Sequence, residues 1–454
     1  MKKFEVLIIG GGPAAITICK ILGQKKQVGI IRPEDYSMIY CAMPYVIEKI
    51  LPIQKTFKKD ELVTDTGAEL IRDTVTHVNL EDREVKTAKG QTYTYDKIVI
   101  TTGALPVLPK IEGYDLKGVS TFKTEEDLKN IQAATENGTK KVVVVGAGAI
   151  GIELAQAFNK IGIKTHIVDA EAHILPNMMD HEMVEAAQAE LIASGVTLHL
   201  NNKVVALKGK EFVKKVMLED GTSIHLHSID DCSEADKNVT GNGLVVFAVG
   251  MRPNVEMFKD TGLAIGRDGI IVNEKMETNI ADVYAAGDCV QFKSGITNEI
   301  ISGKLATNAV PMGRVVAKNM LGENKIYKGF FNGAATKIEN LFVGGSGISE
   351  KLSKNKFEVT VGYSELTTTF PIMPDAKKVK IKLISDKKTK KIIGGQVVSG
   401  TPSADKVDLI TMAIQHELTI DDLMDFSYSS QPYQSFFPAG NLLVNAAENA
   451  EVNI

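Results

Sequence analysis

The sequence predicts an α/β protein that contains two Rossmann-like dinucleotide-binding units. The first unit begins with a short apolar run, Phe4–Ile9, which leads into the turn Gly10-Gly11-Gly12-Pro13-Ala14-Ala15. The second begins with Lys141–Val145, whose four consecutive valines lead into Gly146-Ala147-Gly148-Ala149-Ile150-Gly151. Apolar residues at helical spacing follow both turns, so each copy is predicted to be a strand, a glycine turn and a helix.

The small residues of these turns suit a phosphate-binding loop. The first glycine permits the tight turn, the second lets the backbone approach a pyrophosphate, and the third small residue lets the helix pack on the strand. The helix N-terminus then faces the negative phosphates. Two ordinary strand–helix turns are the alternative, but the occurrence of two copies favours two nucleotide sites.

The composition excludes several classes of protein. The chain has 454 residues, enough for two or three domains, and its net charge of −4 indicates neither a nucleic-acid nor a membrane-surface partner. No apolar run approaches the roughly 20 residues that cross a bilayer, and the N-terminus lacks a signal-peptide pattern. The four cysteines lie far apart, which argues against a disulfide scaffold or a zinc site. We therefore expect a cytoplasmic protein without a bound metal.

Three more apolar runs end in small-residue turns. Lys97–Ile100 leads into Thr101-Thr102-Gly103. A run from Leu244 to Val249 leads into Gly250, and one from Asp282 to Ala286 leads into Gly287-Asp288-Cys289. Each is predicted to be a strand at the edge of which the backbone meets either a ligand or a neighbouring loop.

Taken in order, the motifs GGGPAA, TTGALP, GAGAIGIE, VGMRPN and AAGDC resemble those of the pyridine nucleotide–disulfide oxidoreductase family, over nearly the whole chain. Ser37 and Cys41, followed by Pro44-Tyr45, look like the branch of that family with a single redox cysteine. That branch holds coenzyme A disulfide reductases, NADH oxidases, NADH peroxidases and persulfide reductases. The segment from Leu305 to Gly313 is similar to the same branch.

The resemblance implies three domains and two cofactors, FAD and NADH. Residues 1–110 and 243–325 would form a discontinuous FAD-binding domain, residues 111–242 the NADH-binding domain, and residues 326–454 an α+β dimerisation domain. Within the last, the strict alternation of Lys378–Leu383 is typical of a half-buried strand with its lysines on the solvent side, and Asp386–Lys391 predicts a polar hairpin turn. The residues expected to bind the two cofactors are Gly10, Gly12, Pro13, Ala14, Ala15, Glu34, Ser37, Thr101, Thr102, Gly103, Gly146, Gly148, Ala149, Ile150, Gly151, Glu153, Asp169, Gly250, Gly287, Asp288 and Ala306.

In each unit, the residue at the end of the second strand is expected to contact the ribose of the bound cofactor. The strand Lys164–Val168 ends in Asp169, and an acidic residue there favours the ribose diol of NADH over the 2′-phosphate of NADPH. In the first unit the strand Gln27–Ile31 is followed by Arg32, where the family usually has glutamate. Two interpretations stay open: Glu34 or Asp35 contacts the FAD ribose, or Arg32 packs on the adenosine.

Cys41 is the predicted redox residue. Pro44 is tolerated only near a helix start, so Cys41 is expected at or just before a helix N-terminus, an environment that favours thiolate. From the residues alone, a buried structural cysteine is the favoured interpretation of Cys41. The resemblance reverses that preference and favours the redox role. No second cysteine lies two to five residues away, so Cys41 must cycle through a mixed disulfide, a persulfide or a sulfenic acid.

A tyrosine near the C-terminus is the predicted partner of Cys41. The coenzyme A disulfide reductases carry a Pro-Pro-Tyr there that reaches the other subunit's cysteine, and this chain has Gln431-Pro432-Tyr433. The resemblance therefore implies a homodimer with a shared active site. Three departures weaken the coenzyme A assignment: one proline is missing, Ala42 replaces a glycine, and a second tyrosine is replaced near Phe370.

We therefore predict an FAD-dependent NADH oxidoreductase that reduces a small disulfide, persulfide or polysulfide of the coenzyme A disulfide type. Oxygen reduction by an NADH oxidase is one alternative. The absence of a histidine from Gly12–Ala15, and from everything before His77, counts against it. A sensor in which FAD and Cys41 do not turn over is another.

Several other residues have two interpretations each. Glu153 either faces the nicotinamide or packs as a first-turn helix acid. His225 and His227, with Cys232 nearby, are more consistent with an ordinary strand than with a metal site. Cys19 and Cys289 are expected to pack in the core, and residues 228–243 form a polar insertion.

Overall fold

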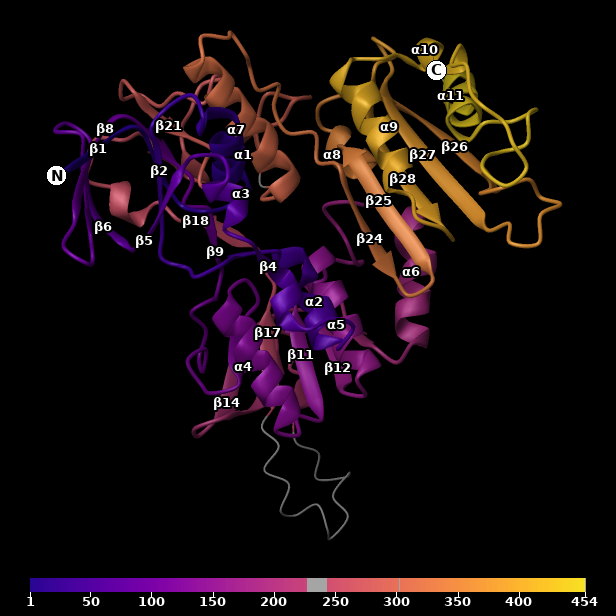
Figure 1. Ribbon diagram of the computed structural model, residues 1–454. Coiled ribbons are helices and arrows are strands. Elements are labelled where there is room, and N and C mark those ends of the chain that lie inside the picture. Colours follow the sequence, from indigo (N-terminus) through magenta and orange to yellow (C-terminus); the bar gives the residue numbers. More distant parts are fainter. Residues whose placement is uncertain (227–242, 302, 454) are drawn as a thin grey trace. The chain divides into compact units, whose positions relative to one another are not determined.

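The computed structural model describes residues 1–226, 243–301 and 303–453 (Figure 1). The chain divides into two compact units, each assembled from separate stretches of sequence. The first unit comprises Met1–Met43, Leu51–Val107 and Gly250–Phe330. The second unit comprises Pro44–Ile50, Leu108–Val249 and Phe331–Ile454.

The first unit is built on one large sheet. Its parallel strands run in the order β5-β2-β1-β8, with β21 also parallel to β8, and β7 and β6 continue it as antiparallel strands. The apolar residues predicted for β1 are buried, as a strand between two parallel neighbours requires. The strands are β1 (Lys2–Ile9), β2 (Val28–Arg32), β5 (Glu69–Arg72), β6 (Val75–Asn79), β7 (Glu84–Thr87), β8 (Thr92–Ile100) and β21 (Val283–Ala285).

Two helices of the first unit pack on each other: α1 (Pro13–Leu22) follows the first glycine turn, and α7 (Ala306–Met320) comes from the end of the unit. Close packing of the two backbones requires glycine, since a Cβ on Gly313 would lie 2.6 Å from the carbonyl oxygen of Ala14. The short elements are β3 (Ser37–Met38), β4 (Phe57–Lys58), α3 (Glu61–Thr64), β9 (Ala104–Pro106), β18 (Met251–Pro253), β19 (Ile265–Gly266), β20 (Gly269–Ile270), β22 (Phe292–Lys293) and β23 (Ile300–Ile301), with 3₁₀ turns at Tyr40–Ala42, Ile53–Thr56 and Glu256–Phe258. Helix α2 (Met43–Ile47) follows the first of these turns in sequence, and all of it except Met43 belongs to the second unit.

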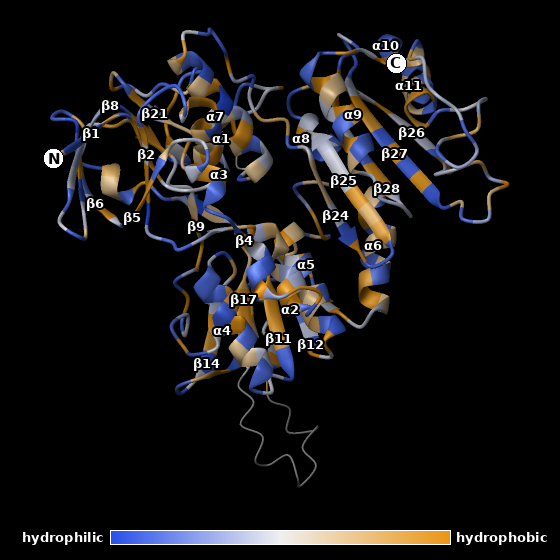
Figure 2. Cartoon of the chain, in the orientation of Figure 1, coloured by the Kyte–Doolittle hydropathy of each residue, from blue (hydrophilic) through white to orange (hydrophobic). Residues whose placement is uncertain are grey.

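The second unit contains a fully parallel sheet in the order β10-β17-β11-β12-β13. Figure 2 shows β11 and β17 in orange, in keeping with their buried valines. The elements of this part are β10 (Val119–Thr121), α4 (Glu125–Glu136), β11 (Lys141–Val145), α5 (Ala149–Lys160), β12 (Lys164–Val168), α6 (His181–Ala193), β13 (Thr197–His199), β14 (Val204–Gly209), β15 (Val213–Leu218), β16 (Ser223–His225) and β17 (Leu244–Phe247).

The C-terminal part of the second unit is an antiparallel sheet in the order β24-β25-β28-β27-β26. Helix α9 packs on β25 and β28, and α11 packs on β26 and β27. The elements are β24 (Ala334–Ile338), β25 (Leu341–Gly347), α8 (Glu350–Ser353), β26 (Val359–Thr367), β27 (Lys378–Asp386), β28 (Ile392–Ser399), α9 (Ala404–Gln415), α10 (Ile420–Met424) and α11 (Leu442–Val452).

These sheets confirm the predicted fold class, two Rossmann-like parallel sheets and a C-terminal α+β region. The division into three domains stays a prediction, because the second unit holds both the second parallel sheet and the antiparallel one. Among the described residues, no helix is both long enough and apolar enough to cross a membrane. His227, Cys232 and all of the 228–243 insertion except Gly243 lie outside the described residues.

The alternating strand Lys378–Leu383 corrects one expectation. Its lysines were expected on the solvent side, but Lys382 is 0% exposed, because carboxylates from the start of α6 and from α8 surround its ammonium. Its ammonium nitrogen lies 2.9 Å from Asp180 Oδ2 and 2.7 Å from Glu350 Oε2, and it also pairs with Glu182. These ion pairs raise the pKa of Lys382, although its burial acts in the opposite direction. They tie α6 and α8 to β27.

Candidate active site

The first glycine turn has the shape of a phosphate-binding loop. Gly10 has φ +105°, and a Cβ there would lie 2.3 Å from the carbonyl oxygen of Thr101, so only glycine fits. Gly12 precedes α1, and a Cβ there would meet nothing within 4 Å. No side chain caps α1, so the backbone N–H groups of Ala14 and Ala15 are open to an anion. These features fit the pyrophosphate of FAD.

Other predicted FAD residues lie beside this turn. The hydroxyl of Thr101 donates to the carbonyl oxygens of Ile9 (2.9 Å) and Gly10 (3.1 Å), which fixes the end of β8 to the turn. Thr102 donates to the carbonyl oxygen of Asn254 at 2.6 Å, and Gly103 and Gly250 both have positive φ. The ends of β1 and β8 therefore meet at one edge of the sheet.

The start of α7 and the turn after β21 complete this edge. A Cβ on Gly287 would lie 3.6 Å from the Cβ of Ala14 and 3.5 Å from that of Ala309. Asp288 follows Gly287, and Lys304 donates to its carbonyl oxygen at 2.9 Å. Ala306 is the first residue of α7. The structure thus brings most of the predicted FAD residues to one edge of the first unit's sheet.

The ribose-binding position differs from the family pattern. Strand β2 extends one residue further than predicted, so Arg32 is its last residue and is buried. A Cβ on Gly11 would lie 2.5 Å from Cδ of Arg32, so the arginine stem packs directly against the glycine turn. Glu34 and Asp35 are exposed in the following loop. Ser37 lies on β3, opposite Lys58 of β4.

Cys41 lies in a 3₁₀ turn immediately before α2, which confirms the predicted place just ahead of a helix. Its thiol is free and its side chain is exposed, unlike a structural core cysteine. Cys19 and Cys289 are buried, as expected, and burial raises the pKa of Cys19 to about 12 and that of Cys289 to about 11. Of the three described cysteines, only Cys41 is therefore accessible as a nucleophile.

A cation that the sequence did not reveal interacts electrostatically with Cys41. Lys58 is half-buried on β4, and β3 holds this strand through the pairs Ser37–Lys58 and Met38–Phe57. Burial lowers the pKa of Lys58, while its electrostatic interaction with Cys41 acts in the opposite direction. Pairing between two-residue strands leaves no clear sequence signal, so only the structure brings this lysine to Cys41.

The second glycine turn repeats the first. Gly146 has φ +113°, and a Cβ there would lie 2.6 Å from the carbonyl oxygen of Ala248. A Cβ on Gly151 would lie only 1.9 Å from the carbonyl oxygen of Gly146, which explains the third small residue of the fingerprint. Gly148 precedes α5, which starts at Ala149 without a side-chain cap. Ile150, in the first turn of α5, is exposed. The turn is open to a second pyrophosphate.

Asp169 lies where a ribose-binding carboxylate is expected. It follows β12, and its Oδ2 accepts the N–H of Ala147 at 2.5 Å while its Oδ1 accepts the N–H of Glu171 at 2.8 Å. Each carboxylate oxygen has two lone pairs, so both can still accept from a ribose hydroxyl. The hydrogen bond to the glycine turn fixes the carboxylate beside it.

Glu153 and Tyr433 occupy very different surroundings. Glu153 lies in α5, accepts a 2.6 Å hydrogen bond from the hydroxyl of Thr336, and has its pKa raised by burial. This hydrogen bond to a hydroxyl on β24 does not decide between the two interpretations of Glu153, so both stay predictions. Tyr433 is 64% exposed, and the carbonyl oxygen of its neighbour Pro432 accepts the N–H of Phe370 at 3.0 Å.

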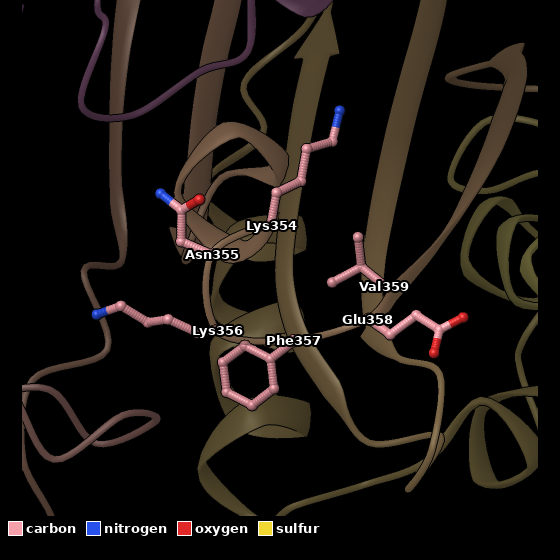
Figure 3. A pocket seen from close by; sticks show the side chains of 6 residues that line it. All are labelled: Lys354, Asn355, Lys356, Phe357, Glu358 and Val359. Carbon is pink, nitrogen blue, oxygen red and sulfur yellow. The ribbon is translucent and has the colours of Figure 1, made fainter.

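Two other features of the second unit do not belong to the candidate site. Asp180, Glu182 and Glu350 form an acidic cluster, but the ammonium of Lys382 lies among them. A surface hollow is lined by Lys354 to Val359, which form the loop after α8 and the first residue of β26, and Figure 3 shows their side chains. None of the predicted cofactor or catalytic residues lines that hollow.

Comparison with known proteins gives two family matches. The family described as pyridine nucleotide-disulphide oxidoreductase matches residues 4–313, and its dimerisation domain matches residues 334–435. An NADH oxidase of Methanocaldococcus jannaschii is 32% identical over 446 residues, covering 94% of each chain. An NAD(P)H coenzyme A polysulfide/persulfide reductase of Pyrococcus horikoshii is 29% identical over 448 residues, covering 94% of this chain and 95% of that protein.

Solved structures also match this chain over nearly its full length. An NAD-dependent persulfide reductase of A. fulgidus superposes with a TM-score of 0.89 at 25% identity, covering 98% of this chain and 83% of the other. Reduced CoADR-RHD of Bacillus anthracis superposes with a TM-score of 0.90 at 25% identity, covering 99% of this chain and 80% of the other.

Proposed function

The chain belongs to the pyridine nucleotide-disulphide oxidoreductase family of enzymes. On that premise we propose that it is an FAD-dependent NADH oxidoreductase that reduces a disulfide, persulfide or polysulfide through Cys41. The observation that carries this proposal is the chemistry of Cys41. It is the accessible thiol among the described cysteines, it lies just ahead of α2, and it interacts electrostatically with Lys58. That setting suits a nucleophilic thiolate.

The family binds FAD and NAD(P)H, and the two glycine turns fit these cofactors. In our proposal the first unit holds FAD through the N–H groups at the start of α1 and through Asp288, while the second unit holds NADH through the start of α5 and through Asp169. When bound, the flavin supplies the electron relay from the nicotinamide to sulfur. Asp169 favours NADH because its charge repels a 2′-phosphate.

The chain's own residues account for the sulfur chemistry. The Cys41 thiolate attacks one sulfur of the substrate, forms a mixed disulfide and expels the other sulfur as a thiolate or hydrosulfide. Lys58 stabilises negative charge on the sulfur of Cys41 before attack and on the same sulfur when it is released. In the proposed homodimer, the phenol of the partner subunit's Tyr433 donates a proton or a hydrogen bond to the departing sulfur.

Oxygen reduction is the second candidate function, since a relative that covers 94% of this chain is an NADH oxidase. The exposed Cys41 is consistent with a sulfenic acid as well as with a mixed disulfide. The absence of a histidine beside the first glycine turn is the observation against the oxidase. A sensor without turnover is not supported, because the family consists of enzymes.

One experiment separates these functions. NADH oxidation is measured anaerobically with coenzyme A disulfide, a glutathione persulfide, polysulfide and a simple disulfide, and then with oxygen as the sole acceptor. We expect one of the sulfur acceptors to give a kcat/KM at least about 100-fold above that for oxygen. Faster turnover with oxygen than with every sulfur acceptor would favour the oxidase. No turnover with any acceptor would contradict both functions.

A further inference from the structure

Arg32 occupies the position at which a Rossmann fold contacts the cofactor's ribose. Strands β1 and β2 are parallel and pair Ile9 with Ile31, so Arg32 follows at the carboxyl edge of the sheet, beside the glycine turn. In the next strand, Arg72 of β5 lies opposite it. Ligands of parallel α/β sheets bind outside this edge, and an acidic residue normally stands there to accept from ribose hydroxyls.

The buried guanidinium of Arg32 has a donor without a partner. The side chain is 3% exposed, and its Nη2 donates both to Asp60 Oδ1 and to the carbonyl oxygen of Asp35 (3.3 Å). Its Nε is buried and has no hydrogen-bond partner among the described residues. An unpaired buried donor is costly, and such groups are rare unless a ligand satisfies them.

Asp60 fixes the direction of this guanidinium. Its Oδ1 accepts from Arg32, while its Oδ2 accepts from the more exposed Arg72. Gly11 leaves room for the stem of Arg32 beside the turn, since a Cβ on Gly11 would lie 2.5 Å from the Cδ of Arg32. Arg32 and Arg72 share the carboxylate of Asp60, so the residue at the ribose position offers hydrogen-bond donors, the reverse of an acidic ribose site.

We propose that Arg32 binds the adenosine half of FAD by donating from its guanidinium to the ribose hydroxyls, in place of the usual carboxylate acceptor. The polarity of the contact is reversed, since a guanidinium has only donors. Asp60 is a positioning residue that acts through Arg32. The charge of Arg32 also attracts the neighbouring pyrophosphate, so salt weakens FAD binding. This inference rests on FAD binding, which the proposed function shares.

The test is FAD affinity, measured on full-length apoprotein by quenching of FAD fluorescence. Arg32→Met keeps an apolar stem beneath Gly11 and removes the donors, and we expect it to raise the dissociation constant about 10- to 100-fold. Arg32→Lys, which keeps the charge, is expected to be intermediate. Asp60→Asn is expected to raise the constant about 3- to 10-fold. Arg83→Gln, a surface arginine paired with Asp282 in the same unit, is the matched control and leaves affinity unchanged.

Competition by ADP locates the effect within the cofactor. ADP carries the adenosine half without the flavin, so Arg32→Met should weaken its competition about as much as it weakens FAD. Raising the ionic strength should weaken FAD binding to the wild type more than to Arg32→Met. Far-UV circular dichroism checks that each apoprotein is folded. If Arg32→Met does not fold, the affinities of Arg32→Lys and the wild type are compared instead.

The outcomes separate this inference from the proposed function. A folded Arg32→Met protein that binds FAD and ADP as the wild type does would overturn the role of Arg32 and leave the enzyme intact. If folded Arg32→Lys binds FAD no more tightly than a folded Arg32→Met protein, the charge of Arg32 has no part in binding and the proposal fails. A wild-type protein that binds no FAD would contradict the proposed function itself.

Discussion

Lys58 interacts electrostatically with Cys41. Strand pairing with β3 holds it half-buried, and the described residues include no carboxylate paired with it. Its charge is therefore available to act on Cys41. The sequence indicates the cysteine but not the lysine, because their proximity depends on a two-residue pairing rather than on a motif.

Replacing Lys58 with methionine should make Cys41 a poorer nucleophile. We expect alkylation of Cys41 by iodoacetamide at neutral pH, followed by mass spectrometry, to slow about 3- to 10-fold, because one partly screened charge is lost. Disulfide turnover should fall by a similar factor. Lys59→Met removes the adjacent, exposed charge and is the control. Equal alkylation rates in the two variants would show that Lys58 does not act on Cys41.

Asp169 should set the choice of nicotinamide cofactor. A carboxylate held beside the glycine turn repels a 2′-phosphate and accepts from a diol, so we expect kcat/KM to favour NADH over NADPH about 10- to 100-fold. Asp169→Ala should narrow that gap. Asp169→Asn keeps an oxygen for the N–H of Ala147 and loses the charge, so it should narrow the gap while the turn stays folded. Equal kcat/KM for both cofactors in the wild type would refute this role.

At the scale of elements, strands β12 and β13 bring together two histidines, of which His166 is buried, and the sequence did not indicate this pair. The Nδ1 of His166 and the Nε2 of His199 are 3.0 Å apart. Burial, followed by the charges of His199, Lys141 and Lys164, lowers the pKa of His166 from 6.5 to about 4. Burial also lowers the pKa of His199. The pair is therefore neutral in the folded protein at pH 7.

This pair should make the second unit sensitive to acid. Between pH 6.5 and 4 the unfolded chain binds a proton at His166 that the folded protein does not, so stability is complete above pH 6.5 and falls as pH drops toward 4. We expect a loss of about 1–3 kcal/mol from this residue. Urea unfolding of the wild type and of His166→Asn at several pH values separates the contribution of His166 to the free energy of unfolding from that of other groups. A pH dependence that is unchanged in His166→Asn would contradict the assignment.

The elements also show what a sequence can reveal. The glycine turns were predictable because Gly10 and Gly146 need positive φ and close approach, which only glycine allows. Arg32 and Asp60 are 28 residues apart, and nothing local marks them as partners. Lys382 follows the alternation of its strand, yet it is buried among acidic residues from α6 and α8, which local periodicity does not predict.

At the scale of the whole molecule, the match of residues 334–435 to a dimerisation domain supports a homodimer. Tyr433 lies on the surface of this region, and Phe370 and Phe437 pack against each other with ring centroids 5.3 Å apart. The competing role for Tyr433 is aromatic packing at the interface. The two roles differ in whether they need the hydroxyl.

Tyr433→Phe should lower disulfide turnover about 10-fold or more if the hydroxyl assists the departing sulfur. The dimer, measured by light scattering, and the reduction of the flavin by NADH should both be unchanged. Unchanged turnover in a stable dimer would leave Tyr433 with packing alone. A wild-type monomer that turns over would exclude the shared active site.

The central claim is that Cys41 carries reduction from the flavin to a sulfur substrate, and Cys41→Ser tests it most directly. Anaerobic stopped-flow absorbance measures flavin reduction by NADH, and steady-state assays of the same preparation measure disulfide or persulfide turnover. We predict near wild-type flavin reduction, since hydride transfer does not involve the sulfur. Turnover should fall at least about 100-fold, because a serine hydroxyl cannot form a mixed disulfide. Wild-type turnover in Cys41→Ser would contradict the account.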